Sequence, residues 1–154
     1  MNSKEGGAPL SILLADDDSD DRYLFYKALK EIPLTTELRT VTNGDELMDF
    51  LYKNAVNLPD VLFLDLSMPR KTGFECLMEI KDDKKLKALS VVMFTTSFSR
   101  GVEIEQNLSI KLSGMGAQDY IRKPAGFENL KTTIHEALIR VIEKARLTEG
   151  KKNL

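Results

Sequence analysis

Four short apolar segments of this chain each end at a residue type that can act on phosphate. The segments cover residues 12–15, 61–64, 91–94 and 120–122. The residues that follow or close them are three consecutive aspartates beginning at Asp16, then Asp65, Thr95 and Lys123. If the segments are parallel strands, these residues meet at the carboxyl edge of one sheet, where ligands bind in open α/β folds. Carboxylates, a hydroxyl and an ammonium gathered there indicate a divalent metal beside an aspartate that can be phosphorylated.

Consecutive acids on a loop most often form a solvated turn or a helix cap, and position argues for more here. Asp16 and Asp17 follow the first expected strand, and Asp65 follows the third, which lies beside the first in a doubly wound order. Two carboxylates at one edge repel each other unless a cation lies between them. Mg2+ fits, because proteins bind it through one or two carboxylates, phosphate oxygens and several waters. Asp18 or Ser19 is better suited to capping the next helix.

The elements that must position these residues alternate regularly along the chain. Short apolar segments are followed by segments of helical period, which is typical of βαβ units and a parallel sheet. A weaker second strand is expected over about residues 37–41, and residues 97–116 are expected to hold the fourth helix and an irregular turn. We therefore predict an α/β fold in which five strands of one doubly wound sheet alternate with five helices. The last helix carries the clearest apolar stripe, formed by Leu130, Ile134, Ala137, Leu138 and Val141.

Composition is that of one soluble domain. The chain has 154 residues, 30% of them charged, and a formal net charge of -2. No basic run suits a nucleic-acid surface, and no apolar run approaches the ~20 residues that span a bilayer. A single cysteine, Cys76, excludes an internal disulfide framework and fits a reducing compartment. We expect a cytoplasmic protein that binds neither nucleic acid nor membrane.

The chain resembles the receiver domain of two-component response regulators, the CheY-like family. The features that carry the resemblance are, in order, Asp16-Asp17, Asp65 with Leu66-Ser67-Met68-Pro69 and Gly73, Thr95, and Lys123-Pro124. An Asp-Asp pair alone is a weak signal, whereas these features in this order are highly specific. The resemblance implies the strand order 2-1-3-4-5. It also implies a receiver domain over residues 10–146. The polar composition of residues 1–9 and 147–154 predicts a flexible N-terminus and a polar, frayed C-terminal tail.

The resemblance also implies the chemistry of the site. Asp65 would accept a phosphoryl group from a histidine kinase or a histidine phosphotransfer protein. Asp17, Asp65 and the backbone carbonyl of Ser67 would bind Mg2+, and Asp16 would act on the metal through water. Attack of a carboxylate on a phosphoryl donor brings two anions together, so the site must neutralise the charge on the transferring oxygens. Mg2+ would do so on one side and the Lys123 ammonium on the other.

Further residues would stabilise and read the phosphate. The Thr95 hydroxyl would donate to a phosphoryl oxygen, and Tyr120 would move inward as Thr95 shifts. Ser67 and Ser97 hold family positions that tune how long the phosphate survives. Each assignment has an ordinary alternative: a surface lysine for Lys123, a strand-end hydroxyl for Thr95, a helix cap for Asp65 and a half-buried edge-strand residue for Tyr120. The shared edge favours the functional interpretation, while both interpretations of Tyr120 stay open.

The chain departs from the family pattern ahead of Lys123. The interval from Thr95 to Lys123 is 28 residues, about one and a half helical turns longer than is usual. This interval contributes to the face of the fourth helix, fifth strand and fifth helix, through which partners would be bound. The segments 65–73 and 95–97 look like those of stand-alone regulators that partner phytochrome-type kinases.

We expect a phosphorylation-controlled switch that is not an enzyme, beyond catalysing its own phosphorylation and dephosphorylation. The chain ends 31 residues after Lys123, so the expected output is binding to another protein or to a second copy in a homodimer. A phosphatase with an aspartate nucleophile needs a second acid where this chain has Ser67. In a flavodoxin-like cofactor binder, the aspartates after the first strand would repel a nucleotide phosphate. A receiver that signals without phosphate is disfavoured because no required group is missing.

Overall fold

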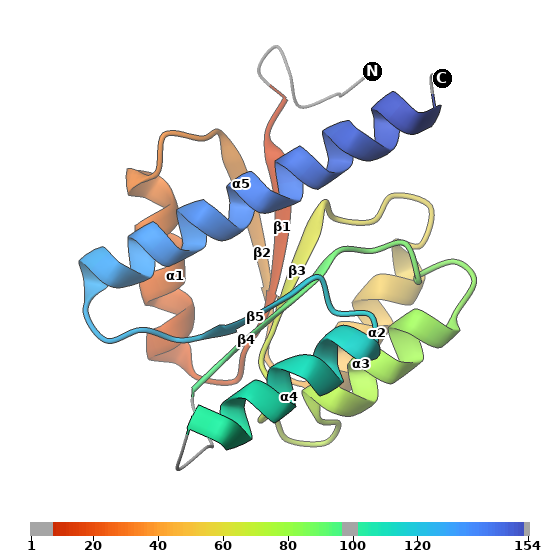
Figure 1. The fold of residues 1–154 in the computed structure, drawn as a ribbon, viewed down its shortest axis with the longest axis horizontal. Helices are drawn as coiled ribbons and strands as arrows, with labels where there is room; N and C mark the ends of the chain where they lie inside the picture. The colour runs from red at the N-terminus through yellow and green to blue at the C-terminus, as the bar shows by residue number, and fades with distance from the viewer. Residues whose placement is uncertain (1–7, 97–101, 153–154) are drawn as a thin grey trace.

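The computed structural model describes residues 8–96 and 102–152 of the chain, in which strands and helices alternate (Figure 1). The elements are, in order, β1 (Leu10–Ala15), α1 (Ser19–Glu31), β2 (Thr36–Val41), α2 (Gly44–Lys53), β3 (Val61–Leu64), α3 (Gly73–Asp82), β4 (Val91–Thr95), α4 (Val102–Gly114), β5 (Asp119–Arg122) and α5 (Phe127–Lys152). The fourth helix lies inside the segment predicted to contain it. Asn43 caps α2 and Asp18 caps α1, each through its side-chain oxygen.

The five strands form one parallel sheet in the order β2-β1-β3-β4-β5, which confirms the predicted fold class. Ala15, the last residue of β1, pairs with Val41 on one side and Leu64 on the other. Thr95, the last residue of β4, pairs with Arg122, the last residue of β5. β1, β2 and β3 therefore end level with one another, whereas β4 and β5 end together two residues further on, because Leu64 pairs with Met93. This register brings the residues that follow them to one edge.

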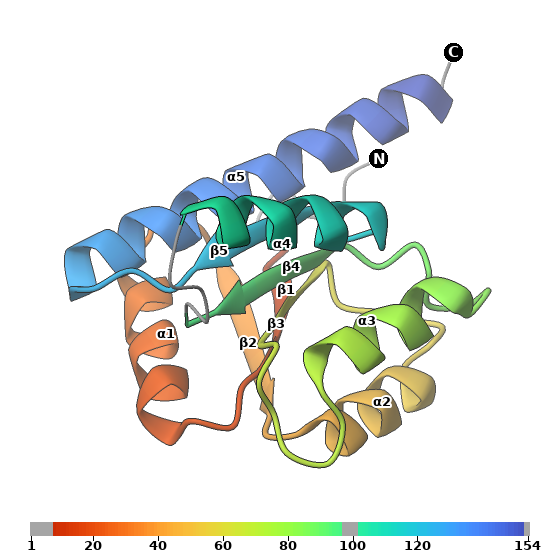
Figure 2. The ribbon, with the colours of Figure 1, turned by 60° about the horizontal axis from the view of Figure 1, so that its bottom comes forward.

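Helices cover both faces of the sheet, which explains why the central strands are almost entirely apolar. Figure 2 shows α1 on one side of the sheet and α2 and α3 on the other. Alternate residues of each strand point to opposite faces. On the side of α1 and α5, the rings of Phe25, Phe63 and Phe94 pack edge to face with centroids 5.0–5.8 Å apart. The other core packs strand residues such as Leu13, Leu62 and Met93 against α2, α3 and α4.

The predicted stripe of the last helix is confirmed, whereas the predicted end of that helix is wrong. The five apolar residues of the stripe are all buried. Helix α5 continues to Lys152, so most of the segment expected to be a frayed tail is helical. The residues from Glu143 to Leu147 are good helix formers, which allows the helix to extend past the core on intrinsic propensity. Within residues 8–96 and 102–152, no helix is long and apolar enough to cross a membrane.

Candidate functional site

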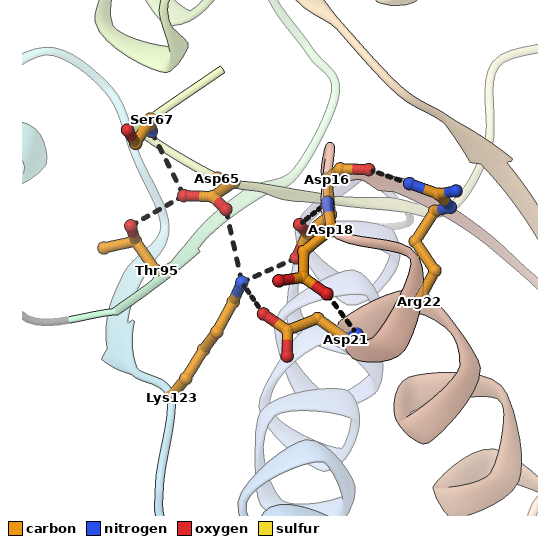
Figure 3. Close-up of polar contacts among 8 residues, drawn as sticks. All are labelled: Asp16, Asp18, Asp21, Arg22, Asp65, Ser67, Thr95 and Lys123. Atoms are coloured by element: carbon orange, nitrogen blue, oxygen red, sulfur yellow. Dashed lines mark hydrogen bonds and ion pairs between the residues drawn. The ribbon is translucent and has the colours of Figure 1, made fainter.

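The carboxyl edge of the sheet gathers the residues that the strand-end pattern singled out (Figure 3). Asp16 follows β1, Asp65 follows β3, Thr95 closes β4 and Lys123 follows β5. Asp16, Asp65 and Thr95 have exposed fractions of 1%, 5% and 0%, and they are the buried polar residues of the chain where the structure describes it. Burying carboxylates is costly unless each is paired and hydrogen-bonded. The partners of these three residues therefore define the site.

The two carboxylate oxygens of Asp65 have different surroundings. Oδ1 accepts hydrogen bonds from the Thr95 hydroxyl at 2.7 Å and from the Ser67 backbone amide at 3.1 Å. Oδ2 accepts from the Lys123 ammonium at 3.2 Å. A hydroxyl, an amide and an ammonium thus converge on one carboxylate from three directions, as Figure 3 shows. Donors arranged in this way can stabilise added negative charge on that side chain.

Lys123 is the charge centre of the site. Its Nζ lies 2.6 Å from Oδ2 of Asp16, 2.9 Å from Oδ2 of Asp21 and 3.2 Å from Oδ2 of Asp65. Burial alone lowers the pKa of Lys123, but the hydrogen bonds to Asp16 and Asp21 and the charges of Asp16 and Asp65 outweigh it. The pKa therefore lies above its ordinary value, and the side chain stays protonated.

Three of the acids fit a metal site. Asp16, Asp17 and Asp65 each offer a carboxylate oxygen, and these oxygens lie within 4.8 Å of one another. Burial raises the pKa of Asp16 even though Lys123 and the Asp18 amide act against the shift. A cation near this cluster would relieve the penalty on the charged form. Oxygen donors on a cluster with one exposed member, Asp17, suit a hard divalent ion that keeps several waters.

The loop after β1 is shaped around Asp16. The Asp18 amide donates to Oδ1 of Asp16 at 3.0 Å, and the Asp18 side chain accepts from the Asp21 amide as the cap of α1. The Arg22 guanidinium donates to the backbone carbonyl of Asp16 at 2.9 Å. The first turn of α1 is thereby fixed against the strand end, and Asp21 is directed toward Lys123.

The loop after β3 is fixed by its return to the sheet at Gly73. A Cβ on Gly73 would lie 2.3 Å from the backbone oxygen of Asp65, so only glycine fits there. Thr72 and Glu75 form a capping box that starts α3. Lys71 contacts Glu79 of α3, which also accepts a hydrogen bond from Tyr52 of α2. These contacts hold the segment that carries Asp65 and Ser67.

Two further predicted residues have different outcomes. Tyr120 lies on the edge strand β5, is half-buried and packs against the core on the side of α2, α3 and α4. Ser97 lies outside the described residues.

Asp21 and Arg22 contact the site but were not predicted from the sequence. The available signal was the continuation of the acidic run into the first turn of the helix, at residues 20 and 21.

Similarity to known proteins agrees with the geometry of the site. Residues 12–135 match the family described as the response regulator receiver domain, so the chain belongs to that family. It is 31% identical to the probable methanogenesis regulatory protein FilR2 of Methanothrix harundinacea (strain 6Ac) over 135 residues, which are 86% of this chain and 83% of that protein.

Solved structures show the same likeness. The phosphorylated cyanobacterial phytochrome response regulator RcpA superposes with a TM-score of 0.72 at 31% identity, covering 84% of this chain and 91% of that one. The Mn(2+)-bound form of response regulator Rcp1 gives a TM-score of 0.71 at 29% identity, covering 83% and 91%. The predicted family is confirmed. The protein is a CheY-like receiver domain of phosphorylation-based two-component signalling.

Proposed function

We propose that Asp65 accepts a phosphoryl group from a histidine kinase or a histidine phosphotransfer protein in a Mg2+-dependent reaction. The observation that carries the proposal is the asymmetric surrounding of the Asp65 carboxylate. Thr95 and the Ser67 amide hold one oxygen, and Lys123 faces the other at 3.2 Å. The known structures of a phosphorylated and a metal-bound relative support this assignment.

The transfer forms one bond and breaks one. A carboxylate oxygen of Asp65 attacks the phosphorus of a phosphohistidine, and a P–O bond forms as the P–N bond breaks. The bonding pair stays on the imidazole nitrogen of the donor. Lys123 neutralises charge on the transferring oxygens, and the Thr95 hydroxyl turns from Asp65 to a phosphoryl oxygen. Dephosphorylation is a separate step: water attacks the phosphorus, the P–O bond to Asp65 breaks, and inorganic phosphate leaves the free carboxylate behind.

The carboxylates divide into direct and indirect metal partners. Both oxygens of Asp16 already accept hydrogen bonds, from the Asp18 amide and from Lys123. Asp17 is exposed and lies in the same cluster. The exposure of Asp17 supports it as a direct ligand. The resemblance to the receiver family adds Asp65 and the backbone carbonyl of Ser67 as ligands, with Asp16 acting through water. When bound, Mg2+ would supply positive charge that offsets the negative charge on the phosphoryl oxygens.

Phosphorylation would act by shifting a conformational equilibrium. Phosphate binds the arrangement in which Thr95 has turned toward it, so the population of that arrangement rises by the difference in affinity. Tyr120 would follow Thr95 inward and alter the face of α4, β5 and α5. The altered face would bind a protein target or a second copy of the chain. Ser67 and Ser97 would set the phosphate lifetime, since small hydroxyls leave room for water.

The test is phosphorylation by a small-molecule phosphodonor with Mg2+, followed by intact mass. We expect the wild type to gain the mass of one phosphoryl group and Asp65→Asn to gain none. Asp49→Asn is the matched control, because Asp49 is an exposed acid on α2. The proposal would be contradicted by an adduct that persists in Asp65→Asn. It would also be contradicted if the wild type formed no adduct either with or without Mg2+. Steady release of phosphate from many esters would indicate a phosphatase instead.

A further inference from the structure

Asp21 is a third partner of Lys123 and the most accessible of the three. It lies in the first turn of α1, and its Oδ2 is 2.9 Å from the Lys123 ammonium. The side chain of Asp21 is 34% exposed, compared with 1% for Asp16 and 7% for Asp65. No step of the proposed transfer uses this residue.

Asp21 matters because it occupies one of the few N–H donors of the Lys123 ammonium. An ammonium carries three N–H donors, and three carboxylates lie within hydrogen-bonding distance of Nζ. No donor remains for a phosphoryl oxygen while all three contacts are kept. One carboxylate must give up its contact when the phosphoryl group arrives.

The three carboxylates differ in what release would cost them. Asp16 is buried, so losing Lys123 would leave its charge under-compensated and away from water. Asp65 itself carries the phosphoryl group and remains beside Lys123. Asp21 can turn toward water, and its place in the first turn of α1 keeps it near the positive end of the helix dipole. Asp21 is therefore the partner that can be exchanged.

We propose that Asp21 is a competing counterion for Lys123. It holds the ammonium over the acid cluster in the unphosphorylated domain and releases it when a phosphoryl group is bound at Asp65. The inference rests on the proposed function of Asp65. Asp21 is a positioning residue, because it acts through Lys123. Removing its charge frees one donor of Lys123 and removes a repulsion on the phosphoryl oxygens, and both effects favour the modified state.

The experiment measures beryllofluoride binding at saturating Mg2+ by 19F NMR titration. The variants are Asp21→Asn and Asp21→Ala, and the matched control is Asp20→Asn, since Asp20 is an exposed acid of the same helical turn. We expect both Asp21 variants to bind beryllofluoride about three- to tenfold more tightly than the wild type. Asp20→Asn should bind as the wild type does. The gain should shrink as salt is raised, because the exposed Asp21 carboxylate is screened.

Two readouts separate competition from a general structural effect. A loosened α1 would weaken beryllofluoride and Mg2+ binding together, whereas competition strengthens beryllofluoride binding without strengthening Mg2+ binding measured alone. Beryllofluoride affinity in both Asp21 variants at or below that of Asp20→Asn would overturn the inference and leave the proposed function standing. Absence of an Asp65-dependent beryllofluoride complex in the wild type would overturn both.

Discussion

The hydroxyl of Thr95 donates a 2.7 Å hydrogen bond to Oδ1 of Asp65, across the ends of two neighbouring strands. Both side chains are buried, and Thr95 has no exposed surface. The bond links the proposed phosphoacceptor to β4, which pairs with the strand that carries Tyr120. A change at Asp65 can thus reach β5 through a single side chain.

Replacing Thr95 tests this link. Thr95→Ala leaves Oδ1 of Asp65 with the Ser67 amide alone, so we expect the free energy of unfolding to fall by about 2 kcal/mol. Thr95→Ser keeps the hydroxyl and should retain most of that stability. Urea denaturation measures both. In the presence of beryllofluoride and Mg2+, the Tyr120 ring resonances should move in the wild type and in Thr95→Ser. An equal movement in Thr95→Ala would show that the switch bypasses this hydroxyl.

Removing the Lys123 ammonium should be costly in the absence of metal. Lys123→Met leaves buried Asp16 and Asp65 without their shared cation, so we expect the free energy of unfolding to fall by about 3–5 kcal/mol. Adding Mg2+ should recover part of the loss, because the ion binds the folded acid cluster. Urea denaturation with and without Mg2+ gives both values.

Lys131→Met is the control for that comparison. Lys131 pairs with Glu31 and Glu128 on the surface, where ion pairs contribute little to stability. We expect a small change that is the same with and without Mg2+. A Mg2+ response of equal size in the Lys123 and Lys131 variants would show that Lys123 is not the counterion of the acid cluster.

The close approach of the chain at Gly73 can be tested by alanine substitution, with Gly114→Ala as the matched control. In Gly73→Ala the new Cβ would meet the backbone oxygen of Asp65 at 2.3 Å, so we expect destabilisation by about 2–3 kcal/mol. A Cβ on Gly114, at the end of α4, would meet nothing within 4 Å. Gly114→Ala should therefore be neutral or stabilising by up to about 1 kcal/mol. Equal stability of the two variants in urea would contradict the close approach at Gly73.

The buried Cys76 thiol predicts a loss of stability at alkaline pH. Burial raises the pKa of Cys76 from 9.0 to about 12. Above pH 9.0 the Cys76 thiol ionises in the unfolded chain but stays protonated in the folded one. The stability contributed by the neutral thiol is therefore complete below pH 9.0 and falls as the pH rises toward 12. The slope from this group is at most about 1.4 kcal/mol per pH unit. Unfolding free energies of the wild type should fall more steeply over this window than those of Cys76→Ala. Parallel curves would contradict the shift.

Much of the fold followed from local pattern. Strands buried on both faces must be apolar throughout, so β1, β3 and β4 are visible as continuous apolar segments of the sequence. Parallel pairing then requires the strand ends to share an edge. This predicted that four residues would lie together: Asp16, Asp65, Thr95 and Lys123. The end of α5 was mispredicted because polar helix formers beyond the core carry no apolar period to reveal a helix.

The sequence by itself determined which residue types lie at the ends of the strands. Buried parallel strands require short apolar segments that alternate with helical ones, and this pattern is visible in composition and spacing. Only the tertiary structure decided which atoms meet. The direction in which α1 leaves β1, fixed by the Asp18 cap and by Arg22 on the Asp16 carbonyl, places Asp21 on Lys123. That contact joins residues 102 positions apart, and its geometry depends on how a helix packs on a sheet. No local spacing encodes it.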